Sequence, residues 1–353
     1  MTEATLRPAR CRVSVVIKAL NEEENICAAI ESCLAAVAEV GGEVILADSH
    51  STDRTVELAS RYPIRIVQLA NPGERCCGVG PQLGYQHSFG EYVYIMDGDM
   101  RMLRGFLPQA LMFLAQHPEV AGIGGRVVEL NSESMEYRER ALRAAVHLAP
   151  GEVDRLDGGG LYRRLAIAET GYFSDRNLHS YEEFDLAVRL RSLGWKLWRL
   201  PVKAVTHYGH ESPPYQLLLR RWRSLYACGL GELVRAATGE RQMRLILRGA
   251  RELRIYTAVL VWWAVLLAAL LWPAPAPARL AVFAALAAAP LLVMLWRKRS
   301  LRRAAYSVVS WCFNAAGLVR GLLRARRPAR EPIESRVIQD PPSMLEPHPP
   351  HYA

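Results

Sequence analysis

The sequence has few cysteines, and no two of them have the C-x-x-C spacing of many zinc sites. Seven cysteines are scattered over 353 residues, and the one close pair, Cys76 and Cys77, is adjacent. This pattern does not favour a tetrahedral metal centre, and an odd total is not typical of a disulfide framework. We therefore expect free thiols in a reducing compartment and no zinc site.

The first ten residues, MTEATLRPAR, lack the apolar core of a signal peptide. Such a core directs the chain that follows it out of the cytoplasm. Its absence agrees with an N-terminal region that stays in the cytoplasm, which is what we expect here.

Charge is absent from two long apolar runs near the C-terminus. Residues 255–272 (IYTAVLVWWAVLLAALLW) and 280–296 (LAVFAALAAAPLLVMLW) contain no Asp, Glu, Lys or Arg, and the Pro-rich link PAPAPA lies between them. A bilayer core of about 30 Å needs roughly 20 helical residues, with a range near 17–25. The runs therefore predict a membrane hairpin. A buried helical hairpin of a soluble domain is the alternative.

Basic residues lie on one side of this hairpin. The connecting loop carries only Arg279, whereas both outer flanks are basic. The positive-inside rule then predicts a cytoplasmic N-terminal region on a chain of the inner or plasma membrane. The net charge of +9 fits attraction to anionic lipid better than binding to nucleic acid, because each basic residue near such a surface contributes about 1 kcal/mol. The flanking residues are Arg248, Arg251, Arg254, Arg297, Lys298, Arg299, Arg302 and Arg303.

Three further C-terminal segments differ in composition. Residues 214–254 interleave apolar and basic residues, which predicts amphipathic helices in the membrane interface, with solvated surface helices as the alternative. Residues 304–319 form a weaker apolar run, for which we favour a shallow or interfacial helix within a membrane region at 255–323. Residues 324–353 are rich in Pro and charge, which predicts a disordered tail.

Strand and helix patterns alternate in the N-terminal half. This rhythm predicts a mostly parallel sheet covered on both faces, with ligands at the carboxyl ends of its strands. Asn21, Asp48 and Asp97 each follow a strand-like run, so we expect them to converge at one edge of the sheet. The strand-like runs are residues 13–17, 44–47, 64–69 and 92–96.

The run YVYIMDGDM ends a predicted strand with two acids. Asp97 and Asp99 are separated only by Gly98, and residues two apart in an extended chain point the same way. Two close carboxylates are stable together when a divalent cation lies beside them. Oxygen ligands favour Mg²⁺ or Mn²⁺, which also take phosphate oxygens. The pattern predicts a site for a nucleotide diphosphate, although Asp-Gly is also a common turn dipeptide.

Five motifs in one order resemble the family 2 glycosyltransferases, whose nucleotide-sugar-binding fold is called GT-A. The resemblance implies an α/β fold with a Rossmann-like mixed sheet, the GT-A nucleotide-diphospho-sugar transferase fold, over residues 12–213. A tail of residues 1–11 would precede it, and C-terminal membrane helices would follow. The motifs are SVVIKALNEEENI, VILADSHSTDRT, GEYVYIMDGDM, DGGGLYRR and SYEEFDLAVRLRSLGWKLWRLP.

The resemblance implies roles in donor binding for several residues of these motifs. Asp48 would accept a hydrogen bond from the base of the nucleotide, typically uracil, so a UDP-sugar is favoured. Capping of a helix that starts near Ser51 is the alternative for this residue. Asp97 would contact the ribose or the metal, and Asp99 would bind Mg²⁺ or Mn²⁺ and the diphosphate. The remaining residues that would line the nucleotide are Ala19, Leu20 and Glu22.

A carboxylate opposite the leaving diphosphate would act as general base for an attacking hydroxyl. By resemblance the candidate is Glu183, but Glu182 stays open because the family often has Glu-Asp where this sequence has Glu-Glu. Acids favoured at a helix N-terminus are the alternative for both. Arg220 and Arg221, with Trp222 beside them, would hold the leaving diphosphate, and lipid-facing charge is the alternative. A single in-line attack inverts the anomeric configuration without an enzyme nucleophile.

Some positions depart from the family pattern. Lys18 stands where Pro is common, and Leu20 stands where an aromatic residue is common, which leaves the base of the donor open. Leu218 stands where processive synthases carry Gln, which argues for the addition of one sugar over a long polymer. His207 and His210, in THYGHE, favour a structural role or a pyrophosphate contact over a metal site.

Together these features predict a membrane-associated inverting glycosyltransferase of glycan or exopolysaccharide biosynthesis. It would move a sugar from a nucleotide-diphospho-sugar to a lipid-linked or membrane-surface saccharide acceptor. Two alternatives stay open. One is a polyprenyl-phosphate glycosyltransferase, whose phosphate nucleophile needs less help from a base. The other is a catalytically silent membrane subunit of a glycan synthase. The sugar and the oligomeric state have no signature in the sequence.

Overall fold

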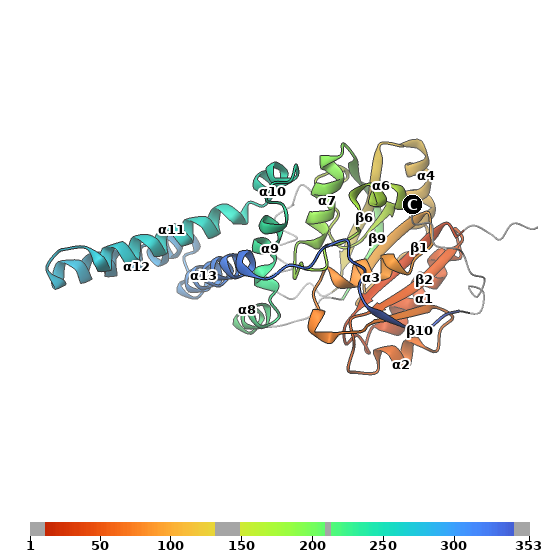
Figure 1. Cartoon of the computed structure of the whole chain (residues 1–353), viewed down its shortest axis with the longest axis horizontal. Coiled ribbons are helices and arrows are strands. Elements are labelled where there is room, and N and C mark those ends of the chain that lie inside the picture. Colours follow the sequence, from red (N-terminus) through yellow and green to blue (C-terminus); the bar gives the residue numbers. More distant parts are fainter. Residues whose placement is uncertain (1–10, 131–148, 209–212, 342–353) are drawn as a thin grey trace, which may run out of the picture. The chain divides into compact units, whose positions relative to one another are not determined.

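The computed structural model describes residues 11–130, 149–208 and 213–341 (Figure 1). The predicted N-terminal tail therefore lies outside the described residues, apart from Cys11. The chain divides into two compact units, which we call the sheet unit and the helical unit. The sheet unit comprises the described residues of Met1–Leu178, Glu182–Glu211 and Arg327–Ala353, and the helical unit those of His179–Tyr181 and Ser212–Arg326.

The sheet unit is built on one mixed sheet. Its strands are β1 (Val13–Ala19), β2 (Gly42–Asp48), β3 (Arg65–Leu69), β4 (Tyr92–Asp97), β5 (Met100–Met102), β6 (Val120–Glu129), β7 (Gly151–Val153), β8 (Gly160–Arg163), β9 (Lys196–His207) and β10 (Ser335–Gln339). They follow the order β10-β3-β2-β1-β4-β8-β6-β9-β5, with β7 paired to β9. The central strand β1 is parallel to β2 and β4, whereas β8 is antiparallel to β4. The carboxyl ends of β1, β2 and β4 therefore meet at one edge.

Helices cover both faces of this sheet, as the alternating pattern predicts. One core cluster contains residues of α1 (Ile26–Val37) and α4 (Phe106–Gln116). The other contains residues of α3 (Val79–Gln86), α6 (Arg164–Thr170) and α7 (Glu182–Ser192). In β1, Val15 and Ile17 belong to the first cluster and Val16 to the second, because neighbouring side chains of a strand point to opposite faces. The short helices α2 (Thr55–Ala59) and η1 (Pro72–Glu74) follow β2 and β3.

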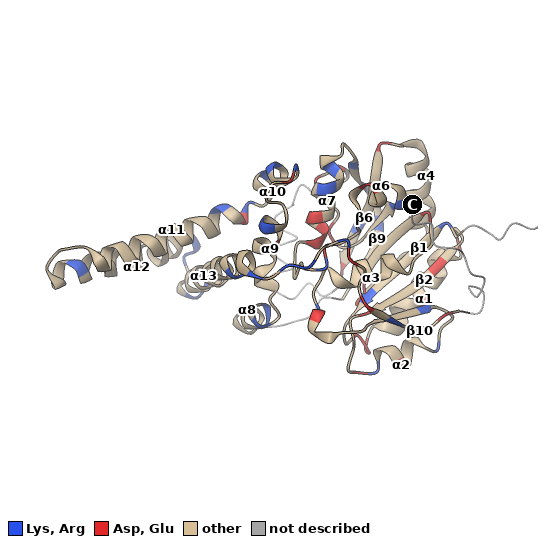
Figure 2. Cartoon of the chain, in the orientation of Figure 1, with Lys and Arg blue, Asp and Glu red and all other residues tan. Residues whose placement is uncertain are grey.

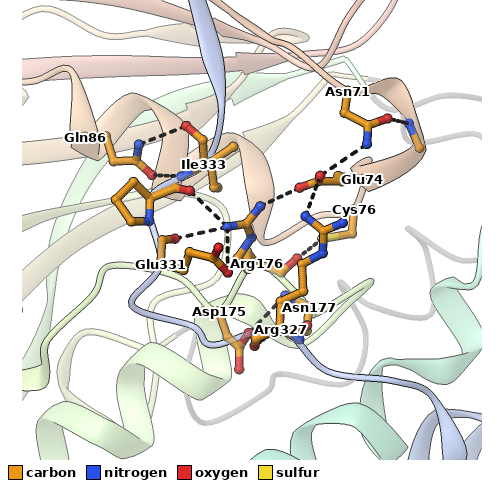
Figure 3. Close-up of polar contacts among 12 residues, drawn as sticks. Asn71, Glu74, Cys76, Gln86, Asp175, Arg176, Asn177, Arg327, Glu331 and Ile333 are labelled. Carbon is orange, nitrogen blue, oxygen red and sulfur yellow. Dashed lines mark hydrogen bonds and ion pairs between the residues drawn. The ribbon is translucent and has the colours of Figure 1, made fainter.

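The C-terminal segment of residues 327–340, which we call the strap, belongs to the sheet unit. Its strand β10 is antiparallel to β3. Upstream of β10, Arg176 donates hydrogen bonds to the carbonyl oxygens of Glu331 (3.1 Å) and Pro332 (3.0 Å), and Gln86 exchanges two hydrogen bonds with the backbone of Ile333 (Figure 3). At its far end, Arg65 Nε lies 2.5 Å from Asp340 Oδ1.

The strap corrects a prediction from composition. We expected residues 324–353 to be disordered. In the described part of this range, a short link without helix or strand leads into β10, which joins the sheet. The reason is that β3, without β10, would be an edge strand with unpaired N–H and C=O groups, and such an edge readily accepts another strand. The remaining predicted tail, residues 342–353, lies outside the described residues.

The helical unit contains helices of two kinds. Two of them, α11 (Glu252–Leu271) and α12 (Ala276–Lys298), are long and apolar enough to cross a membrane by length and composition. Within the most apolar 18 residues of each helix, only 11% and 6% are buried within the chain. Figure 2 shows that these helices carry few charged residues. The others are short or more polar. The helices are α8 (Pro214–Arg223), η3 (Tyr226–Cys228), α9 (Gly229–Ala236), α10 (Met243–Gly249), α11 (Glu252–Leu271), α12 (Ala276–Lys298) and α13 (Leu301–Leu323).

These helices agree with the sequence pattern over the two charge-free runs. The predicted spans at 255–272 and 280–296 fall within or beside α11 and α12. The weaker run at 304–319 is also helical, as part of α13, but it is not among the candidate spans of the described residues. Helix α13 packs closely on α9, because a Cβ atom added at Gly231 would lie 2.1 Å from the carbonyl oxygen of Leu318.

Candidate active site

The ends of β1, β2 and β4 bring the predicted polar residues to one edge of the sheet. In the strand register Ala19 lies opposite Asp48, and Lys18 lies opposite Asp97. The turn after β1 is tied to the turn after β2, because Asn21 Oδ1 accepts a hydrogen bond from the backbone N–H of Thr52 (2.8 Å). The predicted convergence of Asn21, Asp48 and Asp97 at this edge is therefore confirmed.

Asp48 is fully buried and its carboxylate is held by neighbours. Ser51 donates to it from both its hydroxyl (2.5 Å, to Oδ1) and its backbone N–H (3.0 Å, to Oδ2), and Gln68 Nε2 donates to Oδ2 (2.9 Å). These bonds order the turn after β2, as the capping alternative implied. They also fix the direction of the carboxylate, and its contact with a nucleotide base stays a prediction.

A loop after β3 supports the same turn, and sequence reasoning missed it. Arg75 donates hydrogen bonds to the backbone carbonyls of Ser49 (2.8 Å) and His50. Its neighbour Glu74 forms ion pairs with Arg176 and with Arg327 of the strap, the latter at 2.7 Å (Figure 3). The strap is thus connected, through Glu74 and Arg75, to the turn that carries Asp48.

The residues at the end of β1 and just after it differ in exposure around the paired acids. Ala19 is buried, whereas Leu20 is 42% exposed. Glu22 lies beside the Asp-Gly-Asp segment, because a Cβ atom added at Gly98 would lie 2.8 Å from Glu22 Cγ. Burial, together with the negative charge of Asp99, raises the pKa of Glu22 to about 7. The edge is therefore rich in carboxylate, which favours a cationic ligand.

Asp97 and Asp99 have different partners. Asp97 Oδ1 lies 2.9 Å from the ammonium nitrogen of Lys18. Asp99 is buried, its Oδ2 lies 3.3 Å from His207 Nε2, and its Oδ1 has no hydrogen-bond partner among the described residues. The other ring nitrogen of His207 lies 2.6 Å from Glu129 Oε2. Burial opposes the charge of His207, but Asp99 and Glu129 offset it and raise its pKa to about 10.

The acids fit a divalent cation only in part. Among the described residues, no group of three or more His, Cys, Asp or Glu side chains is arranged to hold a metal ion. The buried, unpartnered Oδ1 of Asp99 is nevertheless the hard oxygen ligand that Mg²⁺ and Mn²⁺ prefer, and these ions take their remaining ligands from water and phosphate. A donor diphosphate would complete such a site. The second histidine of the THYGHE motif, His210, lies outside the described residues.

Glu182 and Glu183 begin α7 and have separate contacts. Glu182 Oε1 lies 3.3 Å from Lys18 Nζ, whereas Glu183 Oε1 accepts a hydrogen bond from the backbone N–H of Gly158 (3.2 Å). Burial and the charge of Asp157 raise the pKa of Glu183 to about 8, although Lys18 counteracts them. A base with a raised pKa is a strong proton acceptor once it is deprotonated.

A small cavity of about 20 Å³ lies beside these two glutamates. Lys18 lines one part of it, and Gly159 and Gly160, at the start of β8, line another. An added Cβ atom at Gly159 would lie 2.8 Å from the carbonyl oxygen of Ile95, and its φ of +97° favours glycine. The glycine run therefore allows a close approach of its backbone to the end of β4.

Arg221 and Trp222 lie on α8 in the helical unit, where both are engaged. The guanidinium carbon of Arg221 is 5.3 Å from the ring centroid of Tyr226. Trp222 packs edge-on to Phe313 at 5.8 Å, with Arg320 at 5.1 Å from its ring centroid. These contacts explain how α8 is held within its unit, and a role for Arg221 and Trp222 in donor binding stays a prediction.

Comparison with known proteins shows which family of enzymes the sheet unit resembles. Residues 14–171 match the family described as glycosyl transferase family 2. The "Undecaprenyl-phosphate 4-deoxy-4-formamido-L-arabinose transferase" of Pectobacterium carotovorum is 30% identical over 138 residues, which are 36% of this chain and 40% of the relative. The "Probable glucomannan 4-beta-mannosyltransferase 15" of Arabidopsis thaliana is 26% identical over 171 residues, which are 44% of this chain and 31% of the relative. The chain thus spans less than half the length of either relative.

A solved structure extends the likeness to the fold. The mannosyltransferase PcManGT from Pyrobaculum calidifontis, determined in complex with GDP-Man and Mn²⁺, is 21% identical and has a TM-score of 0.55. The match covers 90% of this chain and 88% of that chain. It confirms the predicted GT-A fold with its mixed α/β sheet.

Proposed function

We propose that the chain, whose residues 14–171 match glycosyl transferase family 2, is a membrane-associated, inverting glycosyltransferase. The proposed donor is a nucleotide-diphospho-sugar, with a UDP-sugar favoured, and the acceptor is a lipid-linked or membrane-surface saccharide of glycan biosynthesis. The observation that carries the proposal is one continuous acidic edge. Asp48 is the last residue of β2 and Asp97 the last residue of β4, the two strands that pair with β1. Lys18 forms ion pairs with both Asp97 and Glu182, the latter at the start of α7.

The donor nucleotide would bind at the ends of β1 and β2. Ala19, Leu20 and Glu22 would line it, and Asp48 would accept a hydrogen bond from its base. The bonds from Ser51 and Gln68 hold the Asp48 carboxylate in one direction before the nucleotide binds. Such preorganisation lowers the entropy cost of binding.

The diphosphate would lie beside the end of β4. Asp99 would hold Mg²⁺ or Mn²⁺ through its unpartnered Oδ1, and Asp97 lies two residues before it. When bound, the ion neutralises the charge that develops on the departing diphosphate. Arg221, with Trp222 beside it, would bind the same group, and the guanidinium of Arg221 would supply positive charge.

Glu183 would carry out the proton transfer. Its carboxylate takes the proton of the acceptor hydroxyl as the hydroxyl oxygen forms a bond to the anomeric carbon of the sugar. The bond from that carbon to the diphosphate breaks on the opposite face, and its electron pair leaves with the diphosphate. One such displacement inverts the anomeric configuration. The N–H of Gly158, which donates to Glu183, would keep the carboxylate in position.

The membrane provides the acceptor in this proposal. Helices α11 and α12 have the length and composition to cross a bilayer, and residues 214–254 would lie in its interface. The basic flanks of the hairpin favour a cytoplasmic sheet unit on the inner or plasma membrane. An acceptor anchored in lipid would then meet the donor at the cytoplasmic surface.

One alternative keeps the donor site and changes the acceptor to a polyprenyl phosphate. The named activity of the Pectobacterium relative, an undecaprenyl-phosphate transferase, favours it. A phosphate oxygen is already a competent nucleophile and needs less help from a base. This version predicts that Glu183→Gln retains most of its activity with a polyprenyl phosphate and loses it with sugar acceptors.

The proposal is tested on the full chain purified in detergent. A thermal-shift screen of nucleotide-sugars with Mn²⁺ comes first, because a ligand that prefers the native state raises its apparent stability. Transfer of the preferred sugar is then measured for wild type, Asp99→Ala and Glu183→Gln. We expect both variants to melt like wild type and to lose about 10²-fold or more in turnover, as expected when a charge-stabilising or proton-transfer group is removed.

Two results would count against the proposal. Unchanged turnover in both variants would refute the assigned roles. Failure of the wild-type chain to bind UDP with Mn²⁺ in a calorimetric titration, together with no donor in the screen, would favour a catalytically silent membrane subunit instead.

A further inference from the structure

Lys18 is a cation at a position where the family pattern commonly has Pro, and the fold encloses it. It is the penultimate residue of β1 and lies opposite Asp97 in the parallel pairing with β4. Helix α3 closes over it, since a Cβ atom added at Gly80 would lie 2.9 Å from Lys18 Cβ. The side chain of Lys18 extends along the edge of the sheet towards the start of α7.

The ammonium group at the end of that stem joins two acids from different elements. It lies 2.9 Å from Asp97 Oδ1 and 3.3 Å from Glu182 Oε1. Asp97 comes from the donor side of the proposed site, and Glu182 directly precedes the proposed base. Burial opposes the charge of Lys18, but Asp97, Glu182 and Glu183 more than offset it and raise its pKa well above the usual value.

We propose that Lys18 is a positioning residue of the transfer reaction, which engages the carboxylates of Asp97 and Glu182 and so leaves Asp99 to bind the metal and Glu183 to take the proton. This inference rests on the proposed function and deepens it. It assigns different roles to the two members of each acid pair, which the sequence presents as near equivalents. The pairs are Asp97 with Asp99 and Glu182 with Glu183.

The remaining contacts of the four acids agree with this division. Asp99 has the unpartnered, buried oxygen, whereas the near oxygen of Asp97 faces an ammonium group. Glu183 receives a backbone N–H from Gly158 and lines the small cavity with Lys18. Removal of one partner from a buried ion pair leaves the others as uncompensated charges. Without Lys18, the carboxylates of Asp97 and Glu182 would repel each other and Glu183, and the start of α7 would lose its link to the end of β4.

The test compares Lys18→Met with Lys18→Arg in the full chain, using the donor found in the screen. Lys18→Met keeps the length of the stem and removes the charge. We expect it to lower kcat by about 10²-fold, the loss typical of a small misplacement of catalytic groups, while the KM for the donor changes by less than about threefold. Lys18→Arg restores a cation and should recover part of kcat. Lys196→Met, at an exposed lysine on β9, is the matched control and should behave like wild type.

A second measurement makes the test independent of general damage to the fold. The double variant Lys18→Met with Glu182→Gln removes the cation and one of its acids together. Residues in one ion-pair network are not additive, so the double variant should lose less kcat than the product of the two single losses. Glu182→Gln alone should lose about tenfold or less, and Glu183→Gln far more. The comparison of Glu182→Gln with Glu183→Gln remains informative even if Lys18→Met fails to fold.

Each outcome bears on one claim. No transfer by wild type would refute the proposed function itself and would be seen before any variant is made. An active wild type with a Lys18→Met variant of unchanged kcat would overturn the role of Lys18 alone. So would multiplicative losses in the double variant, or equal losses in Glu182→Gln and Glu183→Gln.

Discussion

At the residue scale, the site places each acid in a different electrostatic environment. Asp48 is held by hydroxyl, amide and backbone N–H donors, Asp97 by an ammonium group, and Asp99 by an imidazole on one oxygen only. Glu183 has a backbone N–H and a raised pKa. Because the environment of a carboxyl group sets its pKa and its ligands, neighbouring acids can take distinct roles in one reaction.

The raised pKa of Glu183 predicts the pH dependence of transfer. A general base must be deprotonated, so kcat with a sugar acceptor should rise as pH increases through the Glu183 pKa of about 8. The measurement is a profile of kcat from about pH 6 to about pH 9 with the donor saturating. Lys18 lowers this pKa, so the rise should move to higher pH in Lys18→Met. A flat profile over this range would contradict the assignment of Glu183 as the base.

The same pKa predicts how stability depends on pH. Glu183 binds its proton more tightly in the folded chain, at about 8, than at its usual value of 4.5. Its contribution to stability is therefore present below the lower value and is lost as pH rises through the higher one. The melting temperature of wild type should fall more than that of Glu183→Gln between about pH 6 and about pH 9. Parallel falls in the two proteins would contradict this linkage.

The sequence predicted these acids better than it predicted their partners. Asp97 and Asp99 could be found because both follow a buried strand, and a strand end fixes where a side chain lies. The partner of Lys18 on α7, Glu182, is 164 residues away, and no local pattern encodes such a distance. His207 reaches Asp99 only because β9 pairs with β5 in a register that places His207 opposite Met100.

At the element scale, the strap shows how tertiary pairing overrides composition. Its Pro-rich, charged sequence buries little surface of its own, and therefore predicted disorder. The edge of β3 and the side chains of Arg65, Gln86 and Arg176 provide partners that the segment itself lacks. The two apolar helices were predictable because a long charge-free run carries its signal locally.

The strap predicts an effect of C-terminal truncation on nucleotide binding. Deletion of residues 327–353 removes β10 and Arg327, one of the two ion-pair partners of Glu74, so the loop of Arg75 loses support beside the turn of Asp48. We expect a lower melting temperature and an affinity for UDP that is weaker by about tenfold, which equals about 1.4 kcal/mol. Thermal unfolding and calorimetric titration with UDP and Mn²⁺ measure the two effects.

A shorter deletion is the matched control for the strap. Removal of residues 342–353 leaves β10 and all the strap contacts named above in the chain, so this variant should melt and bind UDP like wild type. Equal behaviour of the two truncations would show that the strap supports neither the sheet nor the nucleotide site.

At the scale of the whole molecule, the two units differ in whether their apolar side chains are buried or exposed. The sheet unit buries its apolar residues in two clusters on either side of one sheet. Helices α11 and α12 leave most of their apolar side chains outside any protein core, for example Leu271 and Trp296, which are 73% and 81% exposed. Such surface is stable in lipid and costly in water. A bilayer is therefore the environment that the composition of these helices fits.

The charge around these helices predicts their direction across the membrane, which cysteine labelling can determine. Ala276→Cys, at the start of α12, should react with a membrane-impermeant maleimide in intact cells, because its loop carries only Arg279. Leu301→Cys, at the start of α13 beside the cluster of Arg297 to Arg303, should react only after permeabilisation. The wild-type chain, with its seven native cysteines, gives the background for both.

Labelling of neither cysteine in intact cells would contradict a spanning hairpin and favour helices that lie on the cytoplasmic surface. The reverse pattern would place the basic flanks outside, and with them the sheet unit and its supply of nucleotide-sugar, which would exclude the cytoplasmic transfer proposed here.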